Sequence, residues 1–296
     1  MSTQRRIGQF SVSAIGLGAM PLSASGKPAP PRPQAIATVH AALDAGITLI
    51  DTADIYAPSW DTMGHNEQLV AQALADYPGD TSNVVVATKG GITRSEGEQW
   101  GRNGSPEYLR EAAERSRERL GVESIDLYYW HRPDRSRRYA DGIEALASLK
   151  QDGIIKEIGV SNANVEELQI AIDVLGEGEL AAVQNEFSPK FNHTSLQELE
   201  FCGERGIAFL PWSPLGGTSG GAVELADRYP ILAEVANAHG ASTQLVTLAW
   251  ELSLGEHVIP IPGASRPESI RDSARAMELD LSDYQRSRIN AALLSR

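Results

Sequence analysis

Four side chains able to donate, accept or stabilise a proton follow three predicted β-strands of this chain. Asp51 ends the run TLID and Tyr56 follows five positions later, while Lys89 ends VVVATK and His131 ends DLYYWH. If these strands are parallel, their carboxyl ends lie at one rim, and we expect the four side chains to meet there. Such a cluster is suited to general acid–base chemistry on a bound substrate.

Tyrosine and lysine do acid–base chemistry near neutral pH only when their surroundings perturb them, because their ordinary pKa values are about 10 and 10.4. An ammonium at Lys89 beside Tyr56 favours the phenolate, so we expect it to lower the pKa of Tyr56 and make this side chain a usable general acid. Asp51 is expected to keep Lys89 charged. His131 is expected to hydrogen-bond a substrate carbonyl and polarise it.

The composition indicates a chain with a substantial core and an acidic surface. It has 296 residues, 42% of them hydrophobic, and 26 basic against 39 acidic residues give a net charge of −13. This charge repels polyanions, so neither nucleic acid nor an anionic membrane is an expected partner. No stretch approaches the roughly 18 apolar residues of a membrane span, and the N-terminus lacks a signal-peptide pattern, so we expect a cytoplasmic protein.

The residue pattern gives no support for metal or thiol chemistry. The single cysteine, Cys202, excludes an intrachain disulfide and a thiolate cluster, and its place in LQELEFCGERG favours a packed thiol over a nucleophile. The six histidines show no HExxH or similar ligand spacing. We therefore expect no metal site.

Short β-rich runs alternate with amphipathic helical patterns along most of the chain. After a predicted hairpin at RRIGQFSVS, eight strands are expected at AIGLGAM, ITLIDTA, NVVVATK, DLYYWH, KEIGVSN, AAVQNEF, IAFLPW and HVIPIP. Helical patterns follow them, as in SPEYLREAAERSRERL, where Ser105 and Pro106 form an N-cap and N1 pair. The alternation predicts an α/β fold, a (β/α)8 TIM barrel with a short N-terminal β-hairpin covering its bottom. Residues 1–296 are expected to form a single domain.

The predicted carboxyl ends of the strands are unusually polar for a barrel that only has to pack. The residues expected there are Met20, Asp51, Tyr56, Lys89, His131, Ser161, Asn162, Gln184, Trp212 and Ser213. A nucleotide is not indicated by the usual signals. The segment GLGAMP has Pro21 where a dinucleotide fingerprint needs its third glycine, and LGGTSGG lacks the lysine of a P-loop.

The chain resembles a bacterial-type, NADP(H)-dependent aldo-keto reductase over nearly its whole length. The motifs that carry the resemblance are, in order, IGLGAM, LDAGITLIDTADIY, ATKGG, RLGVESIDLYYWHRPD, LKQDGIIKEIGVSN, VQNEFSP, PWSPLGG and VIPIPGASRPE. The resemblance implies a (β/α)8 barrel that binds NADP(H) without a Rossmann domain and reduces a small aldehyde or ketone to the alcohol. It matches the family's catalytic tetrad to Asp51, Tyr56, Lys89 and His131, with Tyr56 as the general acid.

The resemblance also implies the cofactor contacts. Three side chains match the groups that hydrogen-bond the nicotinamide carboxamide, and Trp212 stands where an aromatic residue stacks on the nicotinamide ring. An arginine at position 266, beside a helix N-terminus, suits the adenosine 2′-phosphate, so NADPH is expected over NADH. The contacts implied are Gly18, Met20, Asp51, the carboxamide set Ser161, Asn162 and Gln184, then Trp212, the pyrophosphate-facing loop Ser213, Pro214, Leu215 and Gly216, and finally Ile261, the 2′-phosphate segment with Gly263, Ser265 and Arg266, and Ser269 on the adenine side.

Several positions depart from the family's pattern. Ser269 and Ser273 stand where relatives often carry amide side chains that touch the adenine. Arg132 stands where a large residue such as Trp is common, and we hypothesise that it favours an anionic or polar substrate. Four aromatic residues could line an apolar substrate site or instead pack between loops and barrel, namely Trp60, Trp100, Phe187 and Phe191.

The residues are also compatible with two other functions. Some relatives of this fold act as nucleotide-binding regulatory subunits with little or no turnover. A metal-free barrel lyase or isomerase would instead use Lys89 to form a Schiff base and would need no redox cofactor. The physiological substrate and the oligomeric state do not follow from these residues.

Overall fold

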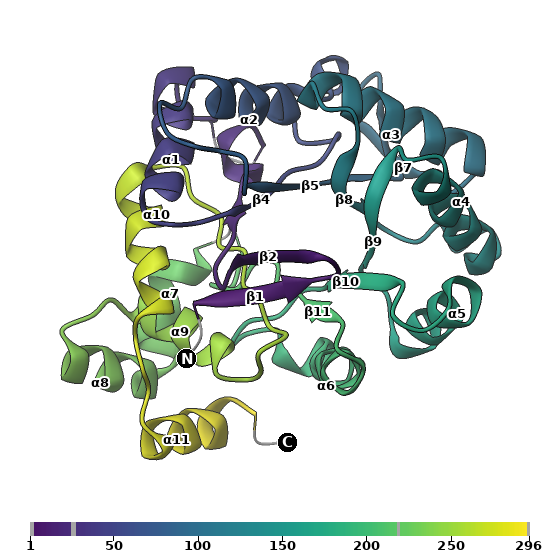
Figure 1. Cartoon of the computed structure of the whole chain (residues 1–296). Coiled ribbons are helices and arrows are strands. Elements are labelled where there is room, and N and C mark those ends of the chain that lie inside the picture. Colours follow the sequence, from purple (N-terminus) through teal and green to yellow (C-terminus); the bar gives the residue numbers. More distant parts are fainter. Residues whose placement is uncertain (1–2, 25–27, 218–219, 295–296) are drawn as a thin grey trace.

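A parallel β-barrel forms the centre of the computed structural model, which describes residues 3–24, 28–217 and 220–294 (Figure 1). Seven strands lie side by side in chain order, each parallel to the next. They are β3 (Leu17–Gly18), β4 (Leu49–Asp51), β5 (Val85–Gly90), β8 (Ile125–Trp130), β9 (Ile155–Ser161), β10 (Leu180–Gln184) and β11 (Ala208–Phe209).

The eighth predicted strand, HVIPIP, closes the barrel without becoming a regular strand. On one side its backbone amides donate to β11, as Ile259 N does to the Phe209 carbonyl at 2.9 Å. On the other side its carbonyls accept from β3, as the Pro262 carbonyl does from Gly18 N at 3.0 Å. Pro260 and Pro262 have no N–H to donate, so this segment cannot complete a ladder, although their carbonyls still accept. The predicted (β/α)8 barrel is confirmed, with an irregular extended segment as its eighth unit.

Helices surround the barrel, with α1 to α6 following one another around its outside and α10 beside α1 (Figure 1). The predicted cap of α3 is present, because Ser105 Oγ accepts a hydrogen bond from Tyr108 N at 3.2 Å and Gly121 ends the helix at a φ of 69°. The helices are α1 (Arg32–Asp44), α2 (His65–Ala75), α3 (Pro106–Leu120), α4 (Tyr139–Gln151), α5 (Val165–Leu175), α6 (Leu196–Arg205), α7 (Gly221–Arg228), α8 (Pro230–His239), α9 (Thr243–Leu252), α10 (Pro267–Ala274) and α11 (Asp283–Leu293).

Side chains along each barrel strand alternate between the barrel interior and the layer of helices. Leu49 and Ala87 belong to the interior cluster, whereas Ile50 belongs to the cluster that joins barrel and helices. Asp51 and Lys89 lie two residues beyond Leu49 and Ala87. Because the side-chain period of a strand is two, both point into the barrel, at the carboxyl end where the apolar interior stops.

The hairpin of β1 (Gln4–Ile7) and β2 (Phe10–Ser13) covers the opposite end, as predicted, and lies across the barrel in Figure 1. Ile7 and Val12 join the interior cluster. Polar contacts tie the hairpin to the starts of the strands, as from Gln9 N to Glu157 Oε1 at 2.9 Å and from Ser13 N to Thr48 Oγ1 at 2.8 Å. The hairpin therefore covers the amino end of the barrel with apolar side chains and hydrogen-bonded polar groups, whereas Asp51 and Lys89 lie at the carboxyl end.

A second hairpin, which the sequence analysis did not predict, stands on the connection from β5 to α3. Its strands are β6 (Ile92–Ser95) and β7 (Gln99–Arg102), and β7 is exposed throughout. Gly97 and Glu98 turn the chain with φ values of 74° and 59°. Its sequence is mostly polar and does not alternate clearly, so the usual strand signal is missing.

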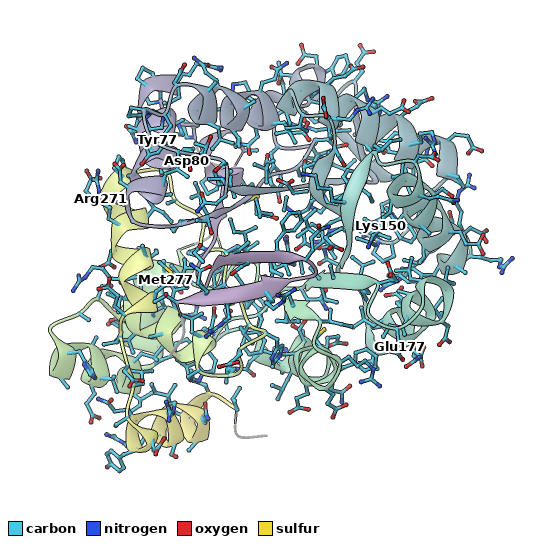
Figure 2. The ribbon with its side chains drawn as sticks, viewed as in Figure 1. Tyr77, Asp80, Lys150, Glu177, Arg271 and Met277 are labelled. Atoms are coloured by element: carbon cyan, nitrogen blue, oxygen red, sulfur yellow. The ribbon has the colours of Figure 1, made fainter. Side chains whose placement is uncertain are left out.

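Charged and polar side chains cover the outer faces of the helices (Figure 2). The labelled Lys150, on α4, donates to Glu179 at 3.0 Å and to Glu157 at 3.2 Å. Within the ranges that the structure describes, no helix is both long and apolar enough to cross a membrane.

One carboxyl group is buried in the helix layer without a partner. Glu251 of α9 is fully buried, and neither of its oxygens has a hydrogen-bond partner in the described part of the chain. Burial raises its pKa well above the ordinary range, because the charged form has lost its water. The folded chain therefore holds this proton more tightly than the unfolded chain does.

We predict that this carboxyl makes stability fall with rising pH. The folded chain keeps the proton above the unfolded pKa of about 4.3, so the group lowers the free energy of unfolding by up to about 1.4 kcal/mol per pH unit until its folded pKa is passed. Glu251→Gln, which cannot ionise, should become progressively more stable than the parent in urea unfolding as the pH rises above about 5. Glu256→Gln, at an exposed position, serves as the control. A stability difference independent of pH would contradict the prediction.

Candidate active site

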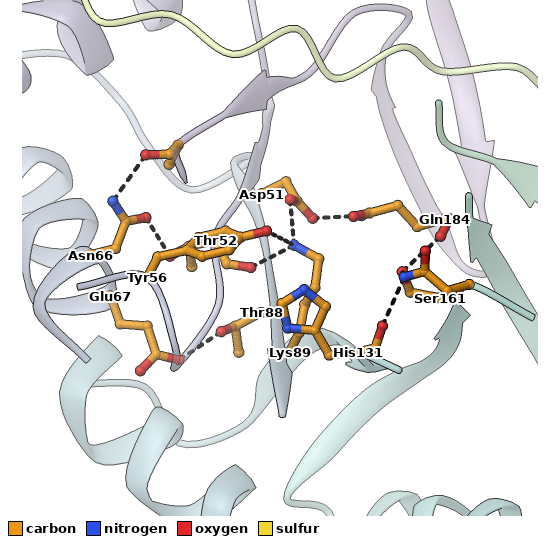
Figure 3. Close-up of polar contacts among 12 residues, drawn as sticks. Asp51, Thr52, Tyr56, Asn66, Glu67, Thr88, Lys89, His131, Ser161 and Gln184 are labelled. Carbon is orange, nitrogen blue, oxygen red and sulfur yellow. Dashed lines mark hydrogen bonds and ion pairs between the residues drawn. The ribbon is translucent and has the colours of Figure 1, made fainter. Parts of the chain in front are cut away.

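The Lys89 ammonium is the centre of a buried polar cluster at the carboxyl end of the barrel (Figure 3). Its Nζ donates to Asp51 Oδ1 at 2.5 Å and to the Thr52 carbonyl at 2.8 Å, and it lies 3.4 Å from the Tyr56 hydroxyl. These three acceptors match the three N–H groups of an ammonium. The side chain is therefore held in one place, with the Tyr56 hydroxyl as its outermost partner.

The charge of Lys89 is kept by its neighbours. Burial lowers the pKa of Lys89, but the Asp51 carboxylate and the Tyr56 hydroxyl outweigh that effect and raise the pKa overall. The second oxygen of Asp51 accepts from Gln184 Nε2 at 2.8 Å. Both carboxylate oxygens are thus occupied, which is the condition under which a buried ion pair is tolerated.

Tyr56 lies in the turn that follows β4, and its side chain is half-buried. Burial raises its pKa, the Lys89 ammonium opposes this, and Asp51 adds to it, so that the pKa is raised overall. The prediction that Lys89 lowers this pKa below its ordinary value is wrong for this structure, because desolvation of the phenolate outweighs the ammonium. Tyr56 accordingly holds its proton at neutral pH, which is the state that a general acid requires.

His131 follows β8 and lies against Tyr56. The two rings meet edge to face, with centroids 5.8 Å apart. Burial lowers the pKa of His131 well below its ordinary value, and the positive charges of Lys89 and Arg132 lower it further. A neutral imidazole has one N–H to donate, so His131 can orient and polarise an oxygen held beside the Tyr56 hydroxyl.

The turn that carries Tyr56 is fixed by polar groups at the start of α2, which the sequence analysis missed. Asn66 N donates to the Tyr56 carbonyl at 3.1 Å, and Asn66 Oδ1 accepts from Thr52 Oγ1 at 2.6 Å. Glu67 Oε1 accepts from Thr88 Oγ1 at 2.6 Å. Thr52 and Thr88 are neighbours of Asp51 and Lys89 in sequence and point outwards from the barrel. The sequence showed only that Asn66 and Glu67 open a helical pattern, and their burial could not be read from it.

The β6–β7 hairpin holds the chain beyond Tyr56. Arg94 Nη1 donates to the Ala57 carbonyl at 2.8 Å, Arg94 Nε pairs with Glu98 at 2.5 Å, and Glu98 accepts from Trp60 N at 3.0 Å. Trp100 is exposed and lies against the Arg94 guanidinium. These contacts connect two loops of the rim that are about forty residues apart in sequence.

The four aromatic residues that could have lined a substrate site lie in different surroundings. Phe187 is fully buried and stacks on Trp250, so it belongs to the core between barrel and helices. Trp60 and Trp100 are exposed at the hairpin, and Phe191 lies under the Lys190 ammonium at 4.8 Å. Phe187 is therefore a core residue and does not line a substrate site together with the other three.

The side chains assigned to the nicotinamide carboxamide lie next to the acid–base cluster. Ser161 Oγ donates to the Gln184 carbonyl at 2.7 Å, and Asn162 Nδ2 donates to the His131 carbonyl at 3.0 Å. Asn162 has a φ of 60° and Ser213 a φ of 54°, the left-handed conformation that residues other than glycine seldom adopt. Two positions assigned to cofactor binding thus carry backbone strain, which concentrates at ligand sites.

Trp212 and the loop after it continue the rim beyond β11. Trp212 packs against the interior cluster, and its buried Nε1 has no hydrogen-bond partner in the described ranges. The loop folds back through a bond from Gly216 N to the Ser213 carbonyl at 2.8 Å. Pro214 and Leu215 lie within this turn, and Gly216 has a φ of 88° that favours glycine.

The last group of assigned positions follows β3 and the eighth segment. A Cβ at Gly18 would lie 2.7 Å from the Ile261 carbonyl, so only glycine permits this close approach, and Gly18 pairs with Gly263 in a parallel bridge. Arg266 is exposed at the N-cap of α10, with Ser269 Oγ 3.4 Å from its Nη2. Two further positions, Met20 after β3 and Ser265 before α10, lie in connections on the same side of the strands.

Metal ligands do not gather at this rim. In residues 3–24, 28–217 and 220–294, no group of three or more His, Cys, Asp or Glu side chains is placed to hold a metal ion. Cys202 is buried, and burial raises the pKa of its thiol, which disfavours the reactive thiolate.

Comparison with known proteins agrees with this geometry. The Aldo/keto reductase family matches residues 14–294 of the chain. An uncharacterized oxidoreductase of Schizosaccharomyces pombe is 33% identical over 279 residues, covering 94% of this chain and 85% of that protein. A probable aldo-keto reductase 1 of Glycine max is 32% identical over 298 residues, covering 93% and 83%. The structure of an aldo/keto reductase from Klebsiella pneumoniae in complex with NADP and acetate is 27% identical, with a TM-score of 0.80 over 99% of this chain and 96% of that one.

The buried ion pair predicts a marked non-additivity of stability. Asp51→Asn leaves a buried ammonium without its counter-ion and should lower the free energy of unfolding by about 3–5 kcal/mol. Adding Lys89→Met removes the stranded charge, so the double variant should be more stable than Asp51→Asn alone. Urea unfolding of the parent, the two single variants and the double variant measures this coupling. Losses that simply add would show that the pair is not coupled.

Proposed function

The chain belongs to the aldo/keto reductase family of oxidoreductases, and from this we propose that it uses NADPH to reduce an aldehyde or ketone to the alcohol. The observation that carries the proposal is the Lys89 cluster, in which a protonated tyrosine and a neutral histidine lie together at the open end of the barrel. The Klebsiella pneumoniae relative described above was solved with NADP, which supports NADP(H) as the cofactor.

In this proposal Tyr56 is the general acid. When bound, the cofactor supplies the hydride that reduces the carbonyl carbon. The Tyr56 hydroxyl gives its proton to the carbonyl oxygen as negative charge develops there. The Lys89 ammonium, 3.4 Å away, stabilises the phenolate that remains, and Asp51 keeps that ammonium in place and charged.

His131 positions the substrate in the same scheme. Its neutral N–H donates to the carbonyl oxygen and holds it near the Tyr56 hydroxyl. A neutral donor suits this task, because a charged imidazolium beside Lys89 would be repelled by the ammonium. The cluster thus combines one acid, one charge that stabilises its conjugate base, and one hydrogen-bond donor.

The residues assigned to the cofactor have chemistry that fits NADP(H). Amide and hydroxyl groups of Ser161, Asn162 and Gln184 complement a carboxamide, and the indole of Trp212 offers a face for an aromatic ring. Glycines in the loop after Trp212 let backbone amides approach a pyrophosphate. Arg266 at the start of α10 suits the 2′-phosphate that distinguishes NADPH from NADH.

A Schiff-base reaction at Lys89 is disfavoured by its surroundings. A lysine that attacks a carbonyl needs a neutral amine and hence a lowered pKa. The pKa of Lys89 is raised instead, and its Nζ is committed to Asp51, the Thr52 carbonyl and Tyr56. Lys89 is better suited to support Tyr56 than to act as a nucleophile.

Tyr56→Phe should reduce kcat by about 10²- to 10⁴-fold, the usual contribution of a general acid, with the dissociation constant of NADPH nearly unchanged. Nicotinamide absorbance measures turnover, and fluorescence titration measures binding. Tyr77→Phe is the matched control, since that hydroxyl binds Asp44 on the outer surface. Near-normal turnover of Tyr56→Phe would rule out this general acid. Tight NADPH binding by the parent, without turnover on any carbonyl, would favour the nucleotide-binding regulatory subunit.

Arg266→Ala should weaken NADPH binding by about 10- to 100-fold and leave NADH binding nearly unchanged, because only NADPH loses a charge-assisted bond to its 2′-phosphate. Dissociation constants for both cofactors give the comparison. Arg110→Ala provides the control, because Arg110 lies on the outer side of α3 and pairs with Asp152. An equal rise in the dissociation constants of NADPH and NADH would mean that Arg266 does not bind the 2′-phosphate.

A further inference from the structure

A half-buried arginine lies beside the acid–base cluster without an ion-pair partner. Arg132 directly follows His131, and its guanidinium carbon is 5.9 Å from the centroid of the Trp212 ring. The Tyr56 hydroxyl acts electrostatically on the same guanidinium. In the part of the chain described by the structure, Arg132 forms no salt bridge, whereas Arg94 and Arg135 on the neighbouring loops pair with glutamates. Within the described ranges, its charge is therefore not paired with a protein carboxylate at ion-pair distance.

The β6–β7 hairpin brings a second arginine to the same segment. Arg102 Nη1 donates to the carbonyl of Pro133, the residue after Arg132, at 3.3 Å. Burial lowers the pKa of Arg132, and repulsion by Arg102 lowers it further, so the two guanidiniums are close enough to repel each other. Glu186, which is half-buried, attracts Arg132 from beyond ion-pair distance. Two guanidiniums against the single carboxylate of Glu186 leave an excess of positive charge in this part of the rim, in a chain of net charge −13, and such an excess attracts an anion.

We propose that Arg132 and Arg102 form an anion-binding subsite beside Tyr56 and His131, and that the substrate is an oxo-acid, an aldehyde or ketone with a carboxylate a few bonds from its carbonyl. The substrate assignment rests on the proposed function. A guanidinium presents a planar fork that matches the two oxygens of a carboxylate, and a partly buried setting strengthens the pair. The anion relieves the repulsion between the arginines, while His131 and Tyr56 hold the carbonyl.

The competing explanation is that Arg132 only packs on Trp212. Arg132→Met keeps an unbranched stem for that packing and removes the charge. If packing were the whole role, loss of Arg132 would affect charged and neutral substrates equally, together with NADPH binding. If Arg132 binds the anionic group of the substrate, its loss should lower kcat/KM for anionic substrates and leave kcat/KM for neutral substrates nearly unchanged. The two roles are therefore distinguished by the ratio of kcat/KM for a charged substrate to kcat/KM for a closely similar neutral one.

The test compares 4-carboxybenzaldehyde with its methyl ester at saturating NADPH. The parent should prefer the acid, and Arg132→Met should lower the ratio of the two kcat/KM values by about 10- to 100-fold. Arg102→Met should lower it less, by about 3- to 10-fold, because Arg102 is more exposed. Arg132→Lys, which keeps the charge without the fork, should recover part of the preference. Arg138→Ala, an exposed arginine later in the same loop, should leave the ratio unchanged.

A binding measurement keeps the subsite testable even without turnover. Benzoate should bind the parent more tightly than benzamide by calorimetry, and Arg132→Met should abolish the difference. A ratio unaffected by Arg132→Met, or an equal loss for acid and ester, would overturn the subsite. Tighter binding of phenyl phosphate than of benzoate would overturn the carboxylate assignment. If benzoate binds as predicted but no carbonyl is reduced, the proposed function fails and the subsite stands.

Discussion

The buried ion pair between Lys89 and Asp51 is the constraint on which the rest of the site depends. An ammonium inside a barrel is tolerated only if a counter-ion and further acceptors meet it with good geometry. Parallel pairing of β4 and β5 sets Asp51 opposite Ala87, and Lys89 follows two residues later on the same inward face. The Thr52 carbonyl and the Tyr56 hydroxyl complete the coordination. The register of two strands therefore fixes the position of the Tyr56 hydroxyl as well.

The surrounding structure serves to hold Tyr56 against that ammonium. Asn66 binds the Tyr56 backbone from α2, and Arg94 binds the next residue's carbonyl from the β6–β7 hairpin. The N-terminal hairpin seals the other end of the barrel with Ile7 and Val12. Apolar packing thus provides the rigidity, while the polar groups gather at the open end, where precise positioning has a chemical use.

Much of this arrangement could be predicted from the sequence, because strand periodicity and the parallel barrel together place the last inward residue of each strand at one rim. A regular eighth strand was predicted at HVIPIP, but the segment is irregular because Pro260 and Pro262 lack N–H groups. The pKa shift of Tyr56 was predicted with the wrong sign, since the degree of burial cannot be read from a short motif. The proximity of Arg102 to Arg132 was also out of reach, because it depends on a hairpin with no clear strand pattern.

The most direct test of the reductase assignment follows the hydride itself. The purified chain would be incubated with an aldehyde and NADPH deuterated at the transferable C4 position, and the alcohol examined by mass spectrometry and NMR. We predict one deuterium on the carbinol carbon, delivered from a single face of the nicotinamide, while the hydroxyl proton comes from solvent through Tyr56. Alcohol without deuterium on that carbon, or NADPH binding with no alcohol formed from any carbonyl, would contradict the assignment.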